Sequence, residues 1–211
     1  MLGNGMSYFF DNALRTAIRT RLDLFPREAL HQGALKRAAV AIAVVPHEEK
    51  AGFLLTRRVA KLTSHAGQWA LPGGRLDEGE GPVEAALREL REEVALDLPP
   101  SEVLGMLDDY PTRSGYLITP VVVWAADLAA MAPNADEVAS IHPFPLSELE
   151  REGSPLFLTI PESERPVIRL LLGESHVHAP TAAVLHQFAE VGLAGRATRV
   201  AHMEQPVWAW R

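Results

Sequence analysis

The most constraining feature of this 211-residue chain is a glycine-led segment, from Gly74 to Leu96, that runs into a short helix. Pro82 suits the first turn of that helix, because the N–H that proline lacks would have no partner within the helix there. Apolar residues then recur at the spacing of one helical face, at Val83, Leu87, Leu90 and Val94. The pattern predicts a loop followed by an amphipathic helix that buries one face against a larger core.

The same helix carries three carboxylates, Glu89, Glu92 and Glu93, whose spacing makes them project from one side. Like charges at this spacing destabilise an isolated helix by roughly 0.2–0.5 kcal/mol per pair. A cation with oxygen ligands, such as Mg²⁺ or Mn²⁺, would remove that cost. Arg88 lies four residues after Glu84 and four before Glu92, so it can hold one carboxylate by a bidentate pair. The helix is therefore a candidate metal site.

Together these residues resemble the signature of the Nudix hydrolase family. That signature reads Gly, five residues, Glu, seven residues, Arg-Glu, an apolar residue, any residue, Glu-Glu, any residue, Gly and an apolar residue. The matching positions here are Gly74, Glu80, Arg88, Glu89, Leu90, Glu92, Glu93, Ala95 and Leu96. Ala95 is the one departure, since the family has glycine there, and we expect a slightly different helix exit that does not touch the ligands.

The resemblance implies a Nudix-type α/β/α sandwich with a mixed sheet. It also implies metal-assisted hydrolysis of a diphosphate bond, with Mg²⁺ or Mn²⁺ as cofactor. Glu89 and Glu93, four residues apart, are the expected principal ligands, with Glu92 completing the cluster and Glu80 joining through water. The general base is left open between Glu92, Glu89 and Glu137, the last of which follows Asp136 in an acidic doublet that is also common in ordinary turns.

A second resemblance lies immediately upstream. Leu54-Leu55-Thr56, Arg58, Gly67 and Leu71-Pro72-Gly73-Gly74 are similar, at the same spacing, to the extra motif of the coenzyme A diphosphatase branch of Nudix enzymes. The chain departs from that motif at three places, where Val59 replaces a small residue, Thr63 an arginine and Leu71 a phenylalanine. The branch splits coenzyme A into adenosine 3′,5′-bisphosphate and phosphopantetheine, which makes coenzyme A or an acyl-CoA the expected substrate.

Candidate substrate-binding residues follow from this motif. Arg58 matches its arginine and is expected to face the substrate, whereas Arg57 alternates to the other face of a strand. Gly73 and Gly74 predict a turn whose backbone amides come close to a ligand. His65 has two open interpretations, contact with the nucleotide or a phosphate and capping of a loop turn.

Two further functions stay open at this point. The signature handles the diphosphate and not the groups attached to it, so ADP-ribose or another nucleoside diphosphate derivative is an alternative substrate. A non-catalytic module that senses a nucleotide is the alternative outside enzymes, and the complete acidic set argues against it. A homodimer is compatible with the sequence, which does not fix the quaternary state.

Charge and composition argue against several classes of partner and location. The net charge is −7 and no basic stripe is present, which argues against nucleic acid as a ligand. The longest apolar run, Ala38 to Val45, is too short to span a bilayer, and Met1 to Arg21 has no continuous apolar core of the kind that a secretory signal requires. The absence of cysteine suits a reducing compartment, so a cytoplasmic protein is expected.

Periodicity elsewhere predicts one domain over residues 1–211, with its core at about 37–149. A helix is expected over 11–24, and strands over 37–45, 52–57, 116–125 and 138–144. A helix over 181–191 and a strand over 207–210 are expected to pack on this core as C-terminal additions. Trp208 and Trp210 would share one face of that strand, as core or interface residues, and His176 and His178 are expected in an exposed loop.

Overall fold

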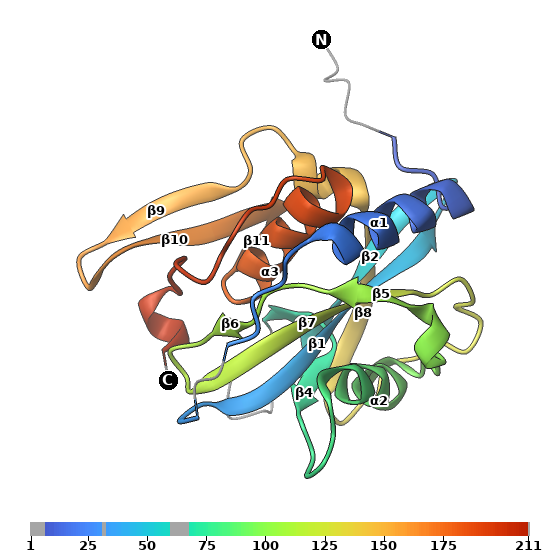
Figure 1. Ribbon diagram of the computed structural model, residues 1–211, viewed down its shortest axis with the longest axis horizontal. Helices are drawn as coiled ribbons and strands as arrows, with labels where there is room; N and C mark the ends of the chain where they lie inside the picture. Colours follow the sequence, from blue (N-terminus) through green and yellow to red (C-terminus); the bar gives the residue numbers. More distant parts are fainter. Residues whose placement is uncertain (1–6, 31–32, 60–67, 211) are drawn as a thin grey trace.

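The computed structural model describes residues 7–30, 33–59 and 68–210, and it places a mixed sheet between helices (Figure 1). Within these ranges the larger sheet contains eight strands. At its centre, β1 (Lys36–His47) runs parallel to β7 (Tyr116–Trp124) and antiparallel to β2 (Lys50–Arg58). These three strands confirm the predicted ones; β1 and β2 are up to a few residues longer at their ends, and β7 ends one residue earlier, at Trp124.

Strands β1 and β2 pair with each other over only four residues each. Two short strands pair with other parts of β1 and β2. β3 (Trp69–Ala70) pairs with β2, and β4 (Gly73–Arg75) pairs with the first half of β1. The link between β3 and β4 is fixed to the central strand, since the Ala41 N–H donates to the Pro72 carbonyl. The remaining strands of this sheet are β5 (Val103–Met106), β6 (Tyr110–Pro111) and β8 (Val138–Pro145).

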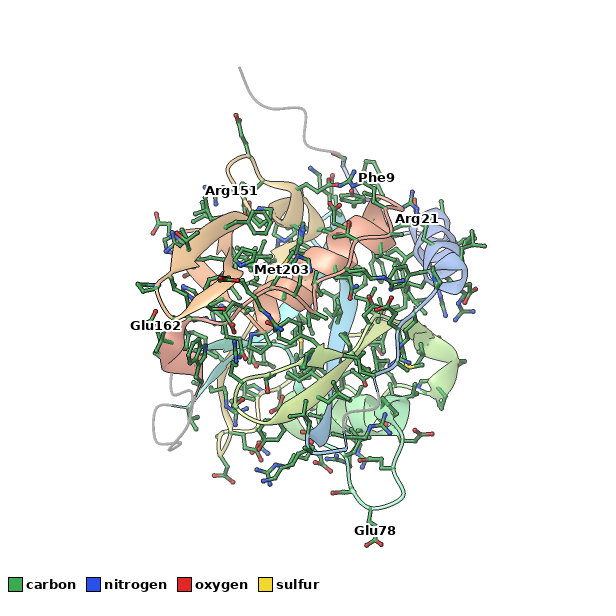
Figure 2. The ribbon with its side chains drawn as sticks, turned by 60° about the vertical axis from the view of Figure 1, so that its left-hand side comes forward. Phe9, Arg21, Glu78, Arg151, Glu162 and Met203 are labelled. Atoms are coloured by element: carbon green, nitrogen blue, oxygen red, sulfur yellow. The ribbon has the colours of Figure 1, made fainter. Side chains whose placement is uncertain are left out.

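Alternation along β1 sends its side chains to two separate cores. Ala39, Ala41 and Ala43 face α2 (Pro82–Val94), and the small side chains let this helix approach the sheet closely. Ile42 and Val44 face the other way, toward α1 (Asn12–Leu24) and α3 (Thr181–Phe188). The predicted α/β/α sandwich is therefore confirmed. Figure 2 shows side chains filling the space between the layers.

Helix α1 follows the sequence closely. Asp11 caps its first turn by accepting a hydrogen bond from the Leu14 N–H at 2.8 Å, and Ile18 and Leu22 are buried. Among the described residues, no helix has the length and apolar character needed to cross a bilayer.

The C-terminal third differs from prediction. A separate three-stranded antiparallel sheet, which the sequence did not reveal, is formed by β9 (Leu156–Ile160), β10 (Ser163–Leu172) and β11 (Ser175–His178). The β9–β10 hairpin extends away from the larger sheet (Figure 1). Buried residues of β10, β11 and α3 nevertheless belong to the same apolar cluster as Ile42 and Val44.

Two predicted C-terminal elements need correction. The strand over 207–210 is wrong, because Pro206 is followed by a 3-10 turn over Val207–Ala209 in which the Ala209 N–H bonds back to the Pro206 carbonyl. The helix predicted over 181–191 exists, but its α-helical part ends at Phe188 and a π-helical turn continues over Ala189–Leu193. Gly192 lies within this π-helical turn and therefore does not mark the end of the helix.

Candidate active site

Helix α2 presents the site and begins as expected, with Gly81 before it and Pro82 in its first turn. Its end corrects one expectation. Ala95 adopts the left-handed conformation with φ of 58°, and its N–H bonds to the carbonyls of Leu90 and Arg91. The Leu96 N–H also bonds to the Leu90 carbonyl, at 3.2 Å. This is the exit that glycine favours, so alanine does not redirect the chain but adopts a backbone conformation that is unfavourable for it.

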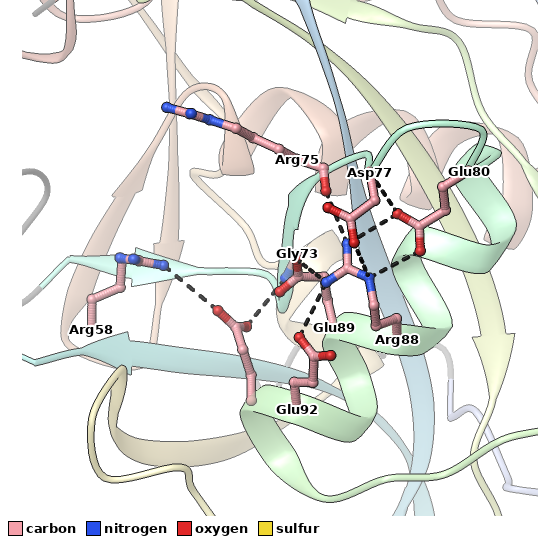
Figure 3. Close-up of polar contacts among 9 residues, drawn as sticks. Arg58, Gly73, Arg75, Asp77, Glu80, Arg88, Glu89 and Glu92 are labelled. Carbon is pink, nitrogen blue, oxygen red and sulfur yellow. Dashed lines mark hydrogen bonds and ion pairs between the residues drawn. The ribbon is translucent and has the colours of Figure 1, made fainter.

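Glu93 is the most buried carboxylate of the helix, with 3% of its surface exposed. Its Oε2 accepts a hydrogen bond from the Gly73 N–H at 3.2 Å, and its Oε1 lies 3.7 Å from Nη1 of Arg58 (Figure 3). Burial and the nearby charge of Glu89 raise the pKa of Glu93 to about 7. The Gly73 amide therefore binds a carboxylate of the protein itself, and its predicted approach to a ligand stays a prediction.

Glu89 lies beside it, packed against the second glycine of the turn. A Cβ on Gly74 would overlap the Glu89 carboxylate, so only glycine leaves room for this side chain. Burial raises the pKa of Glu89, although a hydrogen bond from Arg88 at 2.9 Å opposes that shift. The charge of Glu137, which comes from the loop before β8, raises the pKa of both Glu89 and Glu93.

Arg88 joins the loop to the helix, and its bidentate partner is Glu80. The Arg88 Nε and Nη2 donate to the two Glu80 oxygens at 2.9 and 3.1 Å. This pair lowers the pKa of Glu80. The expected pair with Glu92, four residues on, also forms, but through a single hydrogen bond and not as the bidentate pair. Arg88 also donates to the backbone carbonyl of Arg75 at 2.9 Å, a contact that no side-chain pattern in the sequence could have indicated.

Glu92 lies on the outer side of the helix. Half of its side chain is exposed, and it accepts a hydrogen bond at 3.1 Å from the Arg88 nitrogen that also contacts Glu89. The guanidinium group therefore contacts both of these carboxylates. The three glutamates differ in exposure, since Glu93 is buried and Glu92 is half exposed. In the described part of the chain, no three acidic or histidine side chains already converge in the arrangement of a metal site.

The donor set still fits a hard divalent cation. Glu89 and Glu93 offer buried oxygen ligands, and burial, followed by the charges of neighbouring carboxylates, raises the pKa of both. Glu137 is exposed and adds a third charge from the loop side. Glu80 is less available, because both of its oxygens are bound to Arg88 and one also accepts from the Asp77 N–H. His65 lies outside the described residues.

The C-terminal candidates lie elsewhere than expected. His176 and His178 belong to strand β11 and not to a loop. Trp208 and Trp210 diverge, since Trp208 contacts His178 whereas Trp210 lies beneath the guanidinium group of Arg113. Burial, followed by the charges of Arg169 and His176, lowers the pKa of His178.

Comparisons with known proteins identify the family and the fold of this chain. The family model described as NUDIX domain matches residues 35–171. A protein of Pectobacterium atrosepticum described as "Uncharacterized Nudix hydrolase NudL" is 39% identical over 158 residues, which cover 73% of this chain and 81% of that protein. A protein of Citrobacter koseri with the same description is 43% identical over 119 residues, covering 56% of this chain and 62%, less than two thirds, of the relative.

Among solved structures, the fold is similar to that of a MutT/nudix family protein from Enterococcus faecalis. The TM-score is 0.50 at 20% sequence identity, over 79% of this chain and 63% of that one. The family match spans the strands β1 to β9, most of β10, and helix α2 with its carboxylates. The chain therefore belongs to the Nudix hydrolase family.

Proposed function

We propose that this Nudix hydrolase cleaves the diphosphate bond of a nucleoside diphosphate derivative, and that its substrate is coenzyme A or an acyl-CoA. The products would be adenosine 3′,5′-bisphosphate and phosphopantetheine or its acyl form. One observation carries the choice of substrate. Arg58, which occupies the arginine position of the coenzyme A diphosphatase motif, lies 3.7 Å from Glu93 beside the Gly73 amide. A guanidinium group there can bind a phosphate oxygen next to the carboxylates.

Mg²⁺ or Mn²⁺, when bound, would lower the pKa of a water molecule and offset charge on the phosphate oxygens. Glu89 and Glu93 would hold the cation, with Glu92 as the third carboxylate of the helix. Glu80 would position Arg88 instead of acting as a ligand, because the bidentate pair uses both of its oxygens. Gly73 and Gly74 would keep the turn close to these carboxylates.

A carboxylate would take the proton of the attacking water, and three residues are candidates for this role. Glu89 and Glu92 lie on the helix, and Glu137 lies on the loop close enough for its charge to act on Glu89 and Glu93. Single changes to Gln, with kcat measured across pH, separate them. Unchanged turnover in Glu137→Gln would eliminate the loop candidate.

A substrate panel tests the proposal directly. Coenzyme A, acetyl-CoA, dephospho-CoA, ADP-ribose and a dinucleotide are each incubated with Mg²⁺ or Mn²⁺, and the products are identified by mass spectrometry. Coenzyme A or acetyl-CoA should give the highest kcat/KM. A higher value for ADP-ribose would instead favour the alternative substrate, which Thr63 keeps open because the second arginine of the motif is missing.

The same panel addresses the non-catalytic alternative. Tight binding of one nucleotide without turnover of any substrate would support a sensing module. The matched control is Glu93→Gln, which keeps a hydrogen-bond acceptor for the Gly73 amide but removes a proposed ligand. It should lose turnover while its fold, measured by circular dichroism, stays unchanged.

A further inference from the structure

A cleft lies where the end of β2 meets the C-terminal region. It has a volume of about 350 Å³ and is bounded by the ends of β2 and β3, by β11, by the start of α3 and by the C-terminal turn. Its lining includes Arg57, Trp69, His176, His178, Thr181 and Trp208. We call it the aromatic cleft. Its walls come from elements far apart in the sequence, and most of its lining residues belong to the C-terminal region.

Two tryptophans give the cleft its aromatic character. The Arg57 guanidinium carbon lies 4.8 Å from the centroid of the Trp69 ring, and the Trp208 ring meets His178 edge-on with centroids 5.3 Å apart. Trp208 nevertheless remains 52% exposed. A planar ligand in the cleft would cover apolar ring surface that water now contacts.

The cleft also carries the positive charge of Arg57, and among its described lining residues there is no carboxylate. His176 and His178 add ring nitrogens that can form hydrogen bonds. These features together suit a ligand with both an aromatic ring and a negative charge.

A smaller pocket adjoins the aromatic cleft on the side of the carboxylates. Pro180 and Thr181 line both, and the smaller pocket is also lined by Arg58 and Gly73. Arg58 and Gly73 both contact Glu93. Of the two adjacent arginines on β2, Arg58 thus lies at the carboxylates and Arg57 in the cleft.

We infer that the aromatic cleft binds the nucleoside end of the substrate, with the base against Trp208 and a phosphate group that is not cleaved against Arg57. The inference rests on the proposed diphosphate hydrolysis, since the diphosphate must lie at Glu93 for its nucleoside to reach the cleft. It assigns Arg57 and Trp208 to specificity and not to the chemical step. It also explains why Trp208 is exposed instead of forming part of the core.

Steady-state kinetics test the two contacts separately. Trp208→Ala should raise KM on the order of tenfold for coenzyme A and for dephospho-CoA alike, because both carry the base. Arg57→Gln should raise KM on the order of tenfold for coenzyme A alone, because dephospho-CoA lacks the additional phosphate. In both variants kcat should stay unchanged. The matched control is Phe157→Ala, which removes an equally exposed aromatic ring outside the cleft.

Calorimetry separates this inference from the proposed function, because it needs no turnover. Adenosine 3′,5′-bisphosphate is titrated into the protein in EDTA, and Trp208→Ala and Arg57→Gln should each weaken its binding while Phe157→Ala does not. That result would support the cleft even if no substrate were hydrolysed. Hydrolysis of coenzyme A with wild-type KM in both variants, or bisphosphate binding that neither variant weakens, would overturn the inference and leave the hydrolase in place. An equal effect of Arg57→Gln on coenzyme A and dephospho-CoA would overturn the phosphate contact.

Discussion

Glu93→Gln should stabilise the metal-free protein at alkaline pH. Burial and the charge of Glu89 raise the pKa of Glu93 from its ordinary value of 4.5 to about 7 in the folded chain. Between these two values the folded state keeps a proton that the unfolded state has released, so stability falls as pH rises. Above the folded pKa, the whole penalty is present. A shift of this size corresponds to about 3 kcal/mol.

Gln avoids the penalty, because it is neutral at every pH and still accepts the hydrogen bond from Gly73. In EDTA at about pH 8, the variant should therefore exceed the wild type by about 3 kcal/mol, which corresponds to roughly 6–12 °C in Tm for a domain of this size. The difference should disappear below about pH 3.5, where Glu93 is protonated in both states. Urea denaturation followed by tryptophan fluorescence measures it.

The matched control is Glu92→Gln, which removes the same charge from a half-exposed position on the same helix. Glu92→Gln should not show the gain in stability at alkaline pH that is expected for Glu93→Gln. Mg²⁺ at about pH 8 should restore stability to the wild type and not to Glu93→Gln, because a bound cation stabilises the folded state that holds it. If Glu93→Gln and the wild type lose stability in parallel between about pH 5 and pH 8, the reasoning about buried charge is refuted.

Three further changes test other parts of the site. Ala95→Gly should raise stability by about 0.5–1 kcal/mol, the relief of a left-handed alanine less the entropy that glycine loses, as measured by thermal unfolding; no gain would mean that the conformation costs nothing here. Gly74→Ala should abolish hydrolysis because its Cβ would displace Glu89, whereas Gly33→Ala, which meets no atom, should not change the rate of hydrolysis. Arg88→Lys should lower kcat/KM on the order of tenfold because the planar fork is lost, and an unchanged rate would show that the bidentate pair does not position the site.

The elements whose conformation depends on residues close together in the sequence could be predicted. Helix α2 and its glycine turn could be predicted because Pro82, the apolar spacing and Gly73-Gly74 act within a few residues of one another. The Arg88–Glu80 pair could not, since its partners are eight residues apart and the path of the intervening loop decides whether they meet. Helical spacing indicated the contact with Glu92, four residues on, but could not show that the bidentate pair forms with Glu80.

The C-terminal sheet was not predicted for a different reason. Strand β9 is apolar but largely exposed, with Phe157 at 53%, so it lacks the alternation that marks one buried face. The reverse error occurred at Val207–Ala209, where an apolar run suggested a strand but Pro206 and a hydrogen-bonded turn decide the conformation. Long-range packing, which no local pattern records, determines both segments.

The bracing of the loop before α2 has a practical consequence for engineering. Between Asp77 and Glu80 the chain closes on itself through hydrogen bonds in both directions, and Arg88 ties its base to the helix. Glu78 at the tip projects away from the molecule (Figure 2). Mechanical disturbance at that tip is therefore isolated from Glu89 and Glu93, which makes Glu78 a suitable attachment point for a fluorescent label or a surface tether.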